Sequence, residues 1–168
     1  MNRVTTIFIS LALCLSTLTV QAATQDEIDE ALQLLRNSSS NLVESFTDKE
    51  AAEMLQSEGY GSVEIVKPGK IRFKAEGKIS VLNLYEDGDM RMYFGSTGVE
   101  LTYKAINEWN RTTRLSRAYL DSDKDITLET DLLATAGINK AMVLAMVKTF
   151  VNTSVPRFIK FAKENDQS

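Results

Sequence analysis

Hydrophobic and polar residues alternate most clearly between Ile71 and Phe94, in the middle of the chain. Apolar residues occupy every second position from Ile71 to Ala75, and charged residues stand between them. Because successive side chains of a strand point to opposite faces, this period of two predicts strands with one buried and one exposed face. The Asp87-Gly88 pair suits a tight turn at positive φ and predicts a hairpin. We therefore expect an antiparallel sheet in the middle of the chain.

The expected third strand, which begins after Gly77, does not keep one phase. Ile79 and Val81 stand at odd-numbered positions, as do the apolar residues before them. Leu82 and Leu84 stand at even-numbered positions, which belong to the opposite face of a regular strand. A β-bulge would produce such a slip, and so would a central strand that is buried on both faces. We expect Ile79 and Val81 on the buried side, and both explanations of the slip stay open.

Helical patterns flank this region on both sides. Thr47 and Glu50 form a capping box and Gly59 supplies a left-handed stop, which together predict a helix. The further expected elements are a first strand over Val63–Val66, a helix over Leu101–Arg111, a hairpin of Arg117–Leu120 and Ile126–Leu132, and a final helix from Asn139 to about Lys160. Pro156 lacks a backbone donor and is expected to bend or end that helix. The predicted fold class is α+β, an antiparallel sheet with helices packed on one face, in the order α-β-β-β-β-α-β-β-α after an N-terminal helix.

The first residues have the features of a secretory signal. A positively charged start precedes an apolar run over Ile7–Leu18, and Val20-Gln21-Ala22 matches a signal-peptidase site, so we expect cleavage between Ala22 and Ala23. The run is too polar for a stable membrane span, and the lipobox-like sequence at Cys14 is disfavoured by the large Leu13 before it. We expect a periplasmic or secreted protein. The predicted organisation is a signal peptide (1–22), an N-terminal helix and linker (23–46), an α+β domain (47–161) and a polar C-terminal tail (162–168).

Composition narrows the possible chemistry. The chain has no histidine, and its single cysteine, Cys14, lies in the expected signal peptide. Histidine- and cysteine-based catalysis, histidine-ligated metal sites and disulfides are therefore excluded from the mature protein. The 23 acidic and 19 basic residues give a net charge of −4, which argues against a nucleic-acid partner. We expect neither an enzyme nor a cofactor.

The stretch Asp121–Glu129 superficially resembles a calcium loop of the EF-hand type. Oxygen-bearing side chains stand at alternating positions, but Ile126 occupies the place of the glycine that permits the sharp turn. Leu132 stands where a bidentate glutamate would close the site. The sequence therefore favours a polar hairpin turn over a dedicated calcium site.

Several short motifs resemble the YbjN family of bacterial proteins. They are Tyr85–Asp89, Trp109–Arg111, Arg117–Asp121, Leu128–Leu132 and the Leu55-x-x-x-Gly59-Tyr60 end of the second helix. The resemblance covers about Thr47 to Phe161. It implies an α+β fold similar to that of type III secretion chaperones, which are commonly dimeric, and a role among proteins described as sensory-transduction regulators. It brings no catalytic residues, and the expected signal peptide and N-terminal helix are departures from the cytoplasmic members.

The final helix is the strongest candidate for partner binding. Ala141–Val147 is a run of seven apolar residues, which cannot be hidden on a single helical stripe. Complete burial and contact with a partner both remain open for this helix. Trp109 is expected to anchor its helix in the core, and Arg117 to pair with Asp121 or Glu129.

Two hypotheses of function follow. The first is a non-enzymatic interaction module, chaperone-like or regulatory, that binds a protein partner by apolar packing and strand addition and that could form a homodimer. The alternative is a small-ligand sensor with a pocket between the sheet and the final helix. The candidate surface for either consists of Trp109, Arg111, Arg114, Arg117, Met142, Met146 and Phe150. Arginines inside a pocket near Trp109 would favour the sensor, and an exposed apolar surface on the final helix would favour the interaction module.

Overall fold

The computed structural model describes residues 24–26, 28–29, 32 and 42–167. The chain divides into two units, residues 1–38 and 39–168. The expected signal peptide, with Ala22 and Ala23, lies outside the described residues. In the first unit, the described residues after Thr24 are helical, and Thr24 O accepts a hydrogen bond from Ile28 N at 3.0 Å. Within the described ranges, no helix has both the length and the hydropathy required to cross a bilayer.

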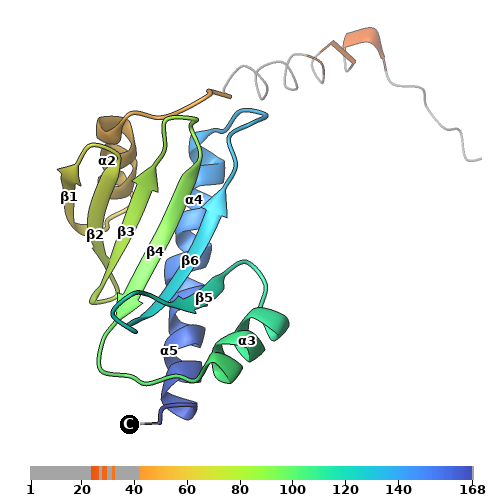
Figure 1. The fold of residues 1–168 in the computed structure, drawn as a ribbon. Coiled ribbons are helices and arrows are strands. Elements are labelled where there is room, and N and C mark those ends of the chain that lie inside the picture. The colour runs from red at the N-terminus through yellow and green to blue at the C-terminus, as the bar shows by residue number, and fades with distance from the viewer. Residues whose placement is uncertain (1–23, 27, 30–31, 33–41, 168) are drawn as a thin grey trace, which may run out of the picture. The chain divides into compact units, whose positions relative to one another are not determined.

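The second unit is an α+β domain whose elements follow the predicted order (Figure 1). Its helices are α2 (Asp48–Ser57), α3 (Tyr103–Thr112), α4 (Lys140–Thr149) and α5 (Val155–Glu164), with the π-helical segment η1 (Phe150–Ser154) between the last two. Its strands are β1 (Gly61–Lys67), β2 (Lys70–Ala75), β3 (Lys78–Leu84), β4 (Met90–Ser96), β5 (Arg117–Leu120) and β6 (Ile126–Leu132). The strands form one sheet in the order β1-β2-β3-β4-β6-β5, and every neighbouring pair is antiparallel.

Helices cover one face of the sheet, and no described helix covers the other, which we call the open face (Figure 1). Figure 1 shows α2, α4 and α5 against the same face, while α3 lies beside β5. The core between these helices and the sheet is formed by fully buried side chains, which include Leu55, Ile71, Phe73, Leu82, Met90, Met92, Leu128, Phe150 and Phe158. The predicted fold class is confirmed.

The phase of β3 corrects one expectation. The turn between β2 and β3 has two residues, Glu76 and Gly77, both at positive φ, so that Ala75 pairs with Lys78. This pairing changes the parity, and Leu82 rather than Val81 then lies opposite Ile71 on the buried face. Ile79 is accordingly 57% exposed on the open face, and its expected burial is wrong. The pairing of β3 with β2 is regular, so no bulge accounts for the change of phase.

The capping box of α2 is confirmed in atomic detail. Glu50 N donates to Thr47 Oγ1 at 3.3 Å, and Thr47 N donates to Glu50 Oε2 at 2.8 Å. These hydrogen bonds favour the ionised carboxylate and lower the pKa of Glu50. Gly59 has φ of +83°, the left-handed conformation expected at the end of this helix.

The final helix is interrupted before Pro156, as predicted. Val155 N donates to Phe150 O in the wider π-helical spacing of η1. Pro156, at the start of α5, has no N–H to offer to the preceding turn, which suits a local change of helical register. Helix α5 continues to Glu164, beyond the expected end at Lys160.

Candidate functional site

Strand β6 is covered along only part of its outer edge. In the pairing with β5, Leu120 lies opposite Ile126 and Arg117 lies opposite Glu129, where β5 begins. The chain before Arg117 departs from the line of β5, and residues 130–132 of β6 have no strand neighbour on that side in the described part of the chain. The C-terminal end of β6, residues 130–132, is therefore a free strand edge.

The hydrogen-bonding groups on this edge follow from the side chain of Asn110. Its Nδ2 donates to Ala118 O at 3.0 Å, and its Oδ1 accepts from Ala118 N at 2.8 Å. Both backbone groups of Ala118 thus point away from β6, so Arg117 and Tyr119 are the residues of β5 that face it. Glu129 of β6, the partner of Arg117, therefore directs its N–H and C=O toward β5. Because this direction alternates along a strand, Asp131, two residues further on, directs its N–H and C=O to the same side, past the end of β5.

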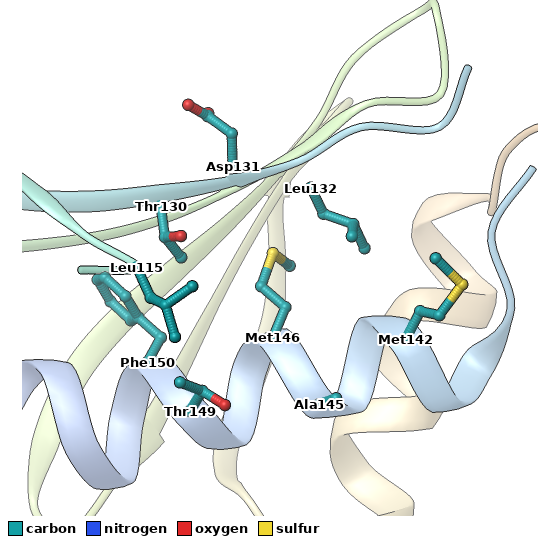
Figure 2. A pocket seen from close by; sticks show the side chains of 9 residues that line it. All are labelled: Leu115, Thr130, Asp131, Leu132, Met142, Ala145, Met146, Thr149 and Phe150. Carbon is teal, nitrogen blue, oxygen red and sulfur yellow. The ribbon is translucent and has the colours of Figure 1, made fainter. Parts of the chain in front are cut away.

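An apolar groove of about 350 Å³ lies between this free edge and α4. Figure 2 shows Thr130 and Leu132 pointing toward the helix and Asp131 pointing away from it. The lining residues are Leu115, Thr130, Asp131, Leu132, Met142, Ala145, Met146, Thr149 and Phe150. Met142 is 38% exposed at one end of the groove, and methionine side chains adapt readily to different apolar partners.

Leu115 stands at the opposite end of the groove, above Thr149 and Phe150 (Figure 2). Its side chain is 66% exposed, which is unusual for a leucine that lines an apolar surface. Its φ of +63° lies in the left-handed region, which is disfavoured for a residue with a branched side chain. Leu115 lies two residues before Arg117, where β5 begins, and the pairing of β5 with β6 does not reach Asp131.

The open face of the sheet carries a network of charges beside the same edge. Glu129, only 3% exposed, accepts from Arg117 Nε at 2.5 Å and lies 3.4 Å from Arg91 Nη1. Asp131 Oδ1 accepts from Arg91 Nε at 2.7 Å, and Asp131 Oδ2 forms an ion pair with Arg117 Nη2 at 3.1 Å. Burial, followed by the negative charge of Glu129, raises the pKa of Tyr119, whose hydroxyl donates to that carboxylate at 3.3 Å.

A second hollow, of about 340 Å³, lies on this open face. It is lined by Tyr85, Asp87, Asp89, Met90, Arg91, Arg117, Asp131 and Leu133. Asp131 lines both hollows, so the free edge of β6 runs between an apolar groove on one side and a charged hollow on the other.

The structure brings together some of the predicted site residues and separates the others. Met142, Met146 and Phe150 line the apolar groove. Trp109 does not, because it is buried in the core with its ring centroid 5.0 Å from that of Phe158, as expected for an anchor.

The three predicted arginines also lie outside the apolar groove. Arg117 pairs with Glu129, one of its two expected partners. Arg111 pairs with Glu108 on α3, whereas Arg114 makes no ion pair with the described residues. A pocket with Trp109 and inward-pointing arginines, which would have favoured the sensor, is thus not the one observed beside α4.

The strand-edge half of the groove was not predicted from the sequence. Leu115, Thr130, Asp131 and Leu132 were not among the candidates, and neither were Ala145 and Thr149 on the α4 side. One signal was available, because the predicted β6 segment is longer than its β5 partner and must leave part of an edge uncovered. Nothing in the sequence marks the positive φ of Leu115.

The acidic turn between β5 and β6 is organised by its own backbone. Asp121 Oδ1 accepts from Asp123 N at 3.0 Å and from Asp125 N at 2.9 Å, as a polar hairpin turn requires. Among the residues that the structure describes, no three acidic side chains converge as a set of metal ligands.

The fold and the groove define a class, namely α+β domains with helices on one face of an antiparallel sheet and an apolar groove beside a free strand edge. Comparison with protein-family models matches residues 52–158 to YbjN, described as "Putative bacterial sensory transduction regulator". The match covers well over half of the chain, and the protein belongs to the YbjN family. No curated protein and no solved structure matches the chain.

Proposed function

We propose that the protein is a non-enzymatic regulatory module that binds an extended segment of a protein partner. The segment pairs with the free edge of β6 at Asp131 and inserts apolar side chains between that edge and α4. The observation that carries the proposal is the coincidence of outward-pointing backbone groups with an apolar groove of about 350 Å³ along the same strand. Strand addition uses these two features together, since main-chain hydrogen bonds give affinity and pockets for alternate side chains give specificity.

The groove suits a peptide better than a small polar ligand. Its walls are mainly the side chains of leucine, methionine, alanine and phenylalanine, and no arginine or lysine of the described chain lines it. The hydrogen-bonding groups at its rim include those of the Asp131 backbone, which an extended main chain matches. Secretion by the predicted signal peptide is part of the proposal, and it places the partner outside the cytoplasm.

Two alanines of α4 provide a matched test. Ala145 and Ala141 are both exposed, but only Ala145 lines the groove. Glutamate is a good helix former, so neither Ala145→Glu nor Ala141→Glu is expected to unfold α4. Ala145→Glu should weaken binding of a peptide with alternating valine and threonine about tenfold or more, because it buries a carboxylate beneath the peptide. Ala141→Glu should bind as the wild type does.

The main-chain contribution is tested with N-methylated peptides and amide chemical shifts. In an antiparallel complex, methylating the peptide residue opposite Asp131 removes the donor to its carbonyl group, and in a parallel complex methylating the following residue does so. We expect one of these methylations to abolish the shift changes at Asp131 and Met146, and the other to be tolerated. Equal binding by both methylated peptides, or equal effects of Ala145→Glu and Ala141→Glu, would refute strand addition at this edge.

A further inference from the structure

A strand added to the free edge would present its side chains alternately to the two hollows. Cross-strand neighbours point to the same face of a sheet. The side chains opposite Thr130 and Leu132 therefore enter the apolar groove, because Thr130 and Leu132 themselves point toward α4 (Figure 2). The side chain between them, opposite Asp131, points to the open face and the charged hollow.

The charged hollow has an excess of negative charge. Its lining contains three carboxylates, those of Asp87, Asp89 and Asp131, and two guanidinium groups, those of Arg91 and Arg117. Both arginines are already engaged by Asp131 and by the adjacent buried Glu129.

Among the described residues, the hydrogen-bond partners of the Asp87 and Asp89 carboxylates are backbone N–H groups. Asp87 Oδ1 accepts from Asp89 N at 3.1 Å, and Asp89 Oδ1 accepts from Ala134 N at 2.7 Å. Neither carboxylate forms an ion pair with a described residue. These two charges are therefore available to a cation that enters the hollow.

We propose that the partner segment has a lysine or arginine between two apolar residues, in the pattern apolar-basic-apolar. The two apolar side chains fill the groove beside Met142 and Met146, and the basic side chain crosses the edge at Asp131 toward Asp87 and Asp89. This inference rests on the proposed function and specifies the chemistry of the segment that it binds.

The negative charge of the hollow also disfavours two acidic segments of this chain as occupants of the edge. The exposed edge strand β1 of a second copy would offer Val63-Glu64-Ile65, which places a carboxylate against the hollow. The residues around Ile28 include Asp26, Glu27, Asp29 and Glu30 and have the same sign. The hollow would repel both segments.

The test compares fluorescein-labelled peptides that differ at one residue, with the cores Thr-Val-Lys-Val-Thr, Thr-Val-Gln-Val-Thr and Thr-Val-Glu-Val-Thr. Fluorescence anisotropy should rank their affinities Lys, then Gln, then Glu. Each step should be on the order of twofold to fivefold, the scale of an exposed ion pair, and should shrink as salt is added.

The double variant Asp87→Asn, Asp89→Asn keeps the oxygen acceptors and should reduce the preference for lysine. Asp123→Asn, which changes the same kind of charge in the distant β5–β6 turn, serves as the control and should keep the preference. Light scattering on the same samples reports the oligomeric state.

The outcomes separate the two proposals. Equal affinity for the three peptides would overturn the basic-residue inference and leave strand addition intact. Absence of binding by all three, with folded protein, would overturn both proposals. A dimer that every peptide dissociates equally, whatever its charge, would identify a second copy as the occupant and overturn the inference.

Discussion

Replacement of the buried Glu129 by glutamine tests how much the open-face network stabilises the sheet. The side chain of Glu129 is 4% exposed, and Arg117 Nε lies 2.5 Å from its Oε1. A hydrogen bond to a charged group contributes about 1.5–3 kcal/mol to the free energy of unfolding. Glutamine lacks the charge but can retain one acceptor oxygen for these hydrogen bonds. The arginines left behind are 33% and 53% exposed and still pair with Asp131, so no buried charge is stranded. The larger loss seen on breaking a fully buried pair therefore does not apply. We expect Glu129→Gln to lower the free energy of unfolding by about 2 kcal/mol.

Urea unfolding followed by circular dichroism measures this loss, and Asp131→Asn is its control. The side chain of Asp131 is 32% exposed, so its removal should cost less than about 1 kcal/mol. The two variants remove the same charge from neighbouring positions of one face and differ mainly in burial. If Glu129→Gln is as stable as the wild type, the desolvation of the carboxylate offsets its ion pairs, and the network contributes no net stability.

Three further predictions concern the core, the helix cap and the groove. Phe158 is fully buried, so Phe158→Ala should lower the free energy of unfolding by about 4 kcal/mol. Tyr103 is 78% exposed, so Tyr103→Ala should change this free energy little. Equal urea midpoints of the two variants would contradict this assignment of the core. Hydrogen bonds to Thr47 lower the pKa of Glu50 in the folded state. The ionised Glu50 side chain therefore stabilises the fold above the pKa of the unfolded state, and this stabilisation is lost as the pH falls through the pKa of the folded state. Thermal unfolding of Glu50→Gln between neutral and acidic pH should therefore show a weaker acid dependence than the wild type, and identical curves would exclude this linkage. Met142→Glu, at a side chain 38% exposed, should stay folded with the same mass by light scattering and lose binding of the lysine peptide; an unfolded variant would show that this residue belongs to the core.

The sequence predicted correctly the features that depend on residues close together in the chain. The capping box of Thr47 and Glu50 is a contact between residues three apart, so the sequence contains both partners. The bounds of β5 and β6 agree with the predicted ones because a buried face imposes a period of two on a strand. Pro156 marked the break in the final helix because its missing N–H acts at a fixed distance along the chain.

The candidate site was only half predicted, because it depends on how distant elements meet. Met142 and Met146 were recognisable as apolar residues in excess of one helical stripe. That they line a groove beside a free strand edge depends on the length of β5 relative to β6 and on the position of Leu115, which no periodicity encodes. The parity of β3 failed for a related reason, since the two-residue turn at Gly77 shifts every side chain that follows it to the other face.

A comparison of the edges of the sheet supports the proposal that the free part of β6 pairs with a partner segment. Unpaired edges invite unwanted association, and proteins commonly protect them with bulges, charges or covering side chains. Edge strand β1 has two register shifts, and Ser62 within it has φ of +49°. The outer edge of β5 is occupied by the side chain of Asn110, which satisfies both backbone groups of Ala118. The pairing of β6 with β4 is regular through Leu132, and an apolar groove lies beside the free part of its edge. An edge left regular in a sheet whose other edges are irregular or covered supports the proposal that a partner segment pairs with it.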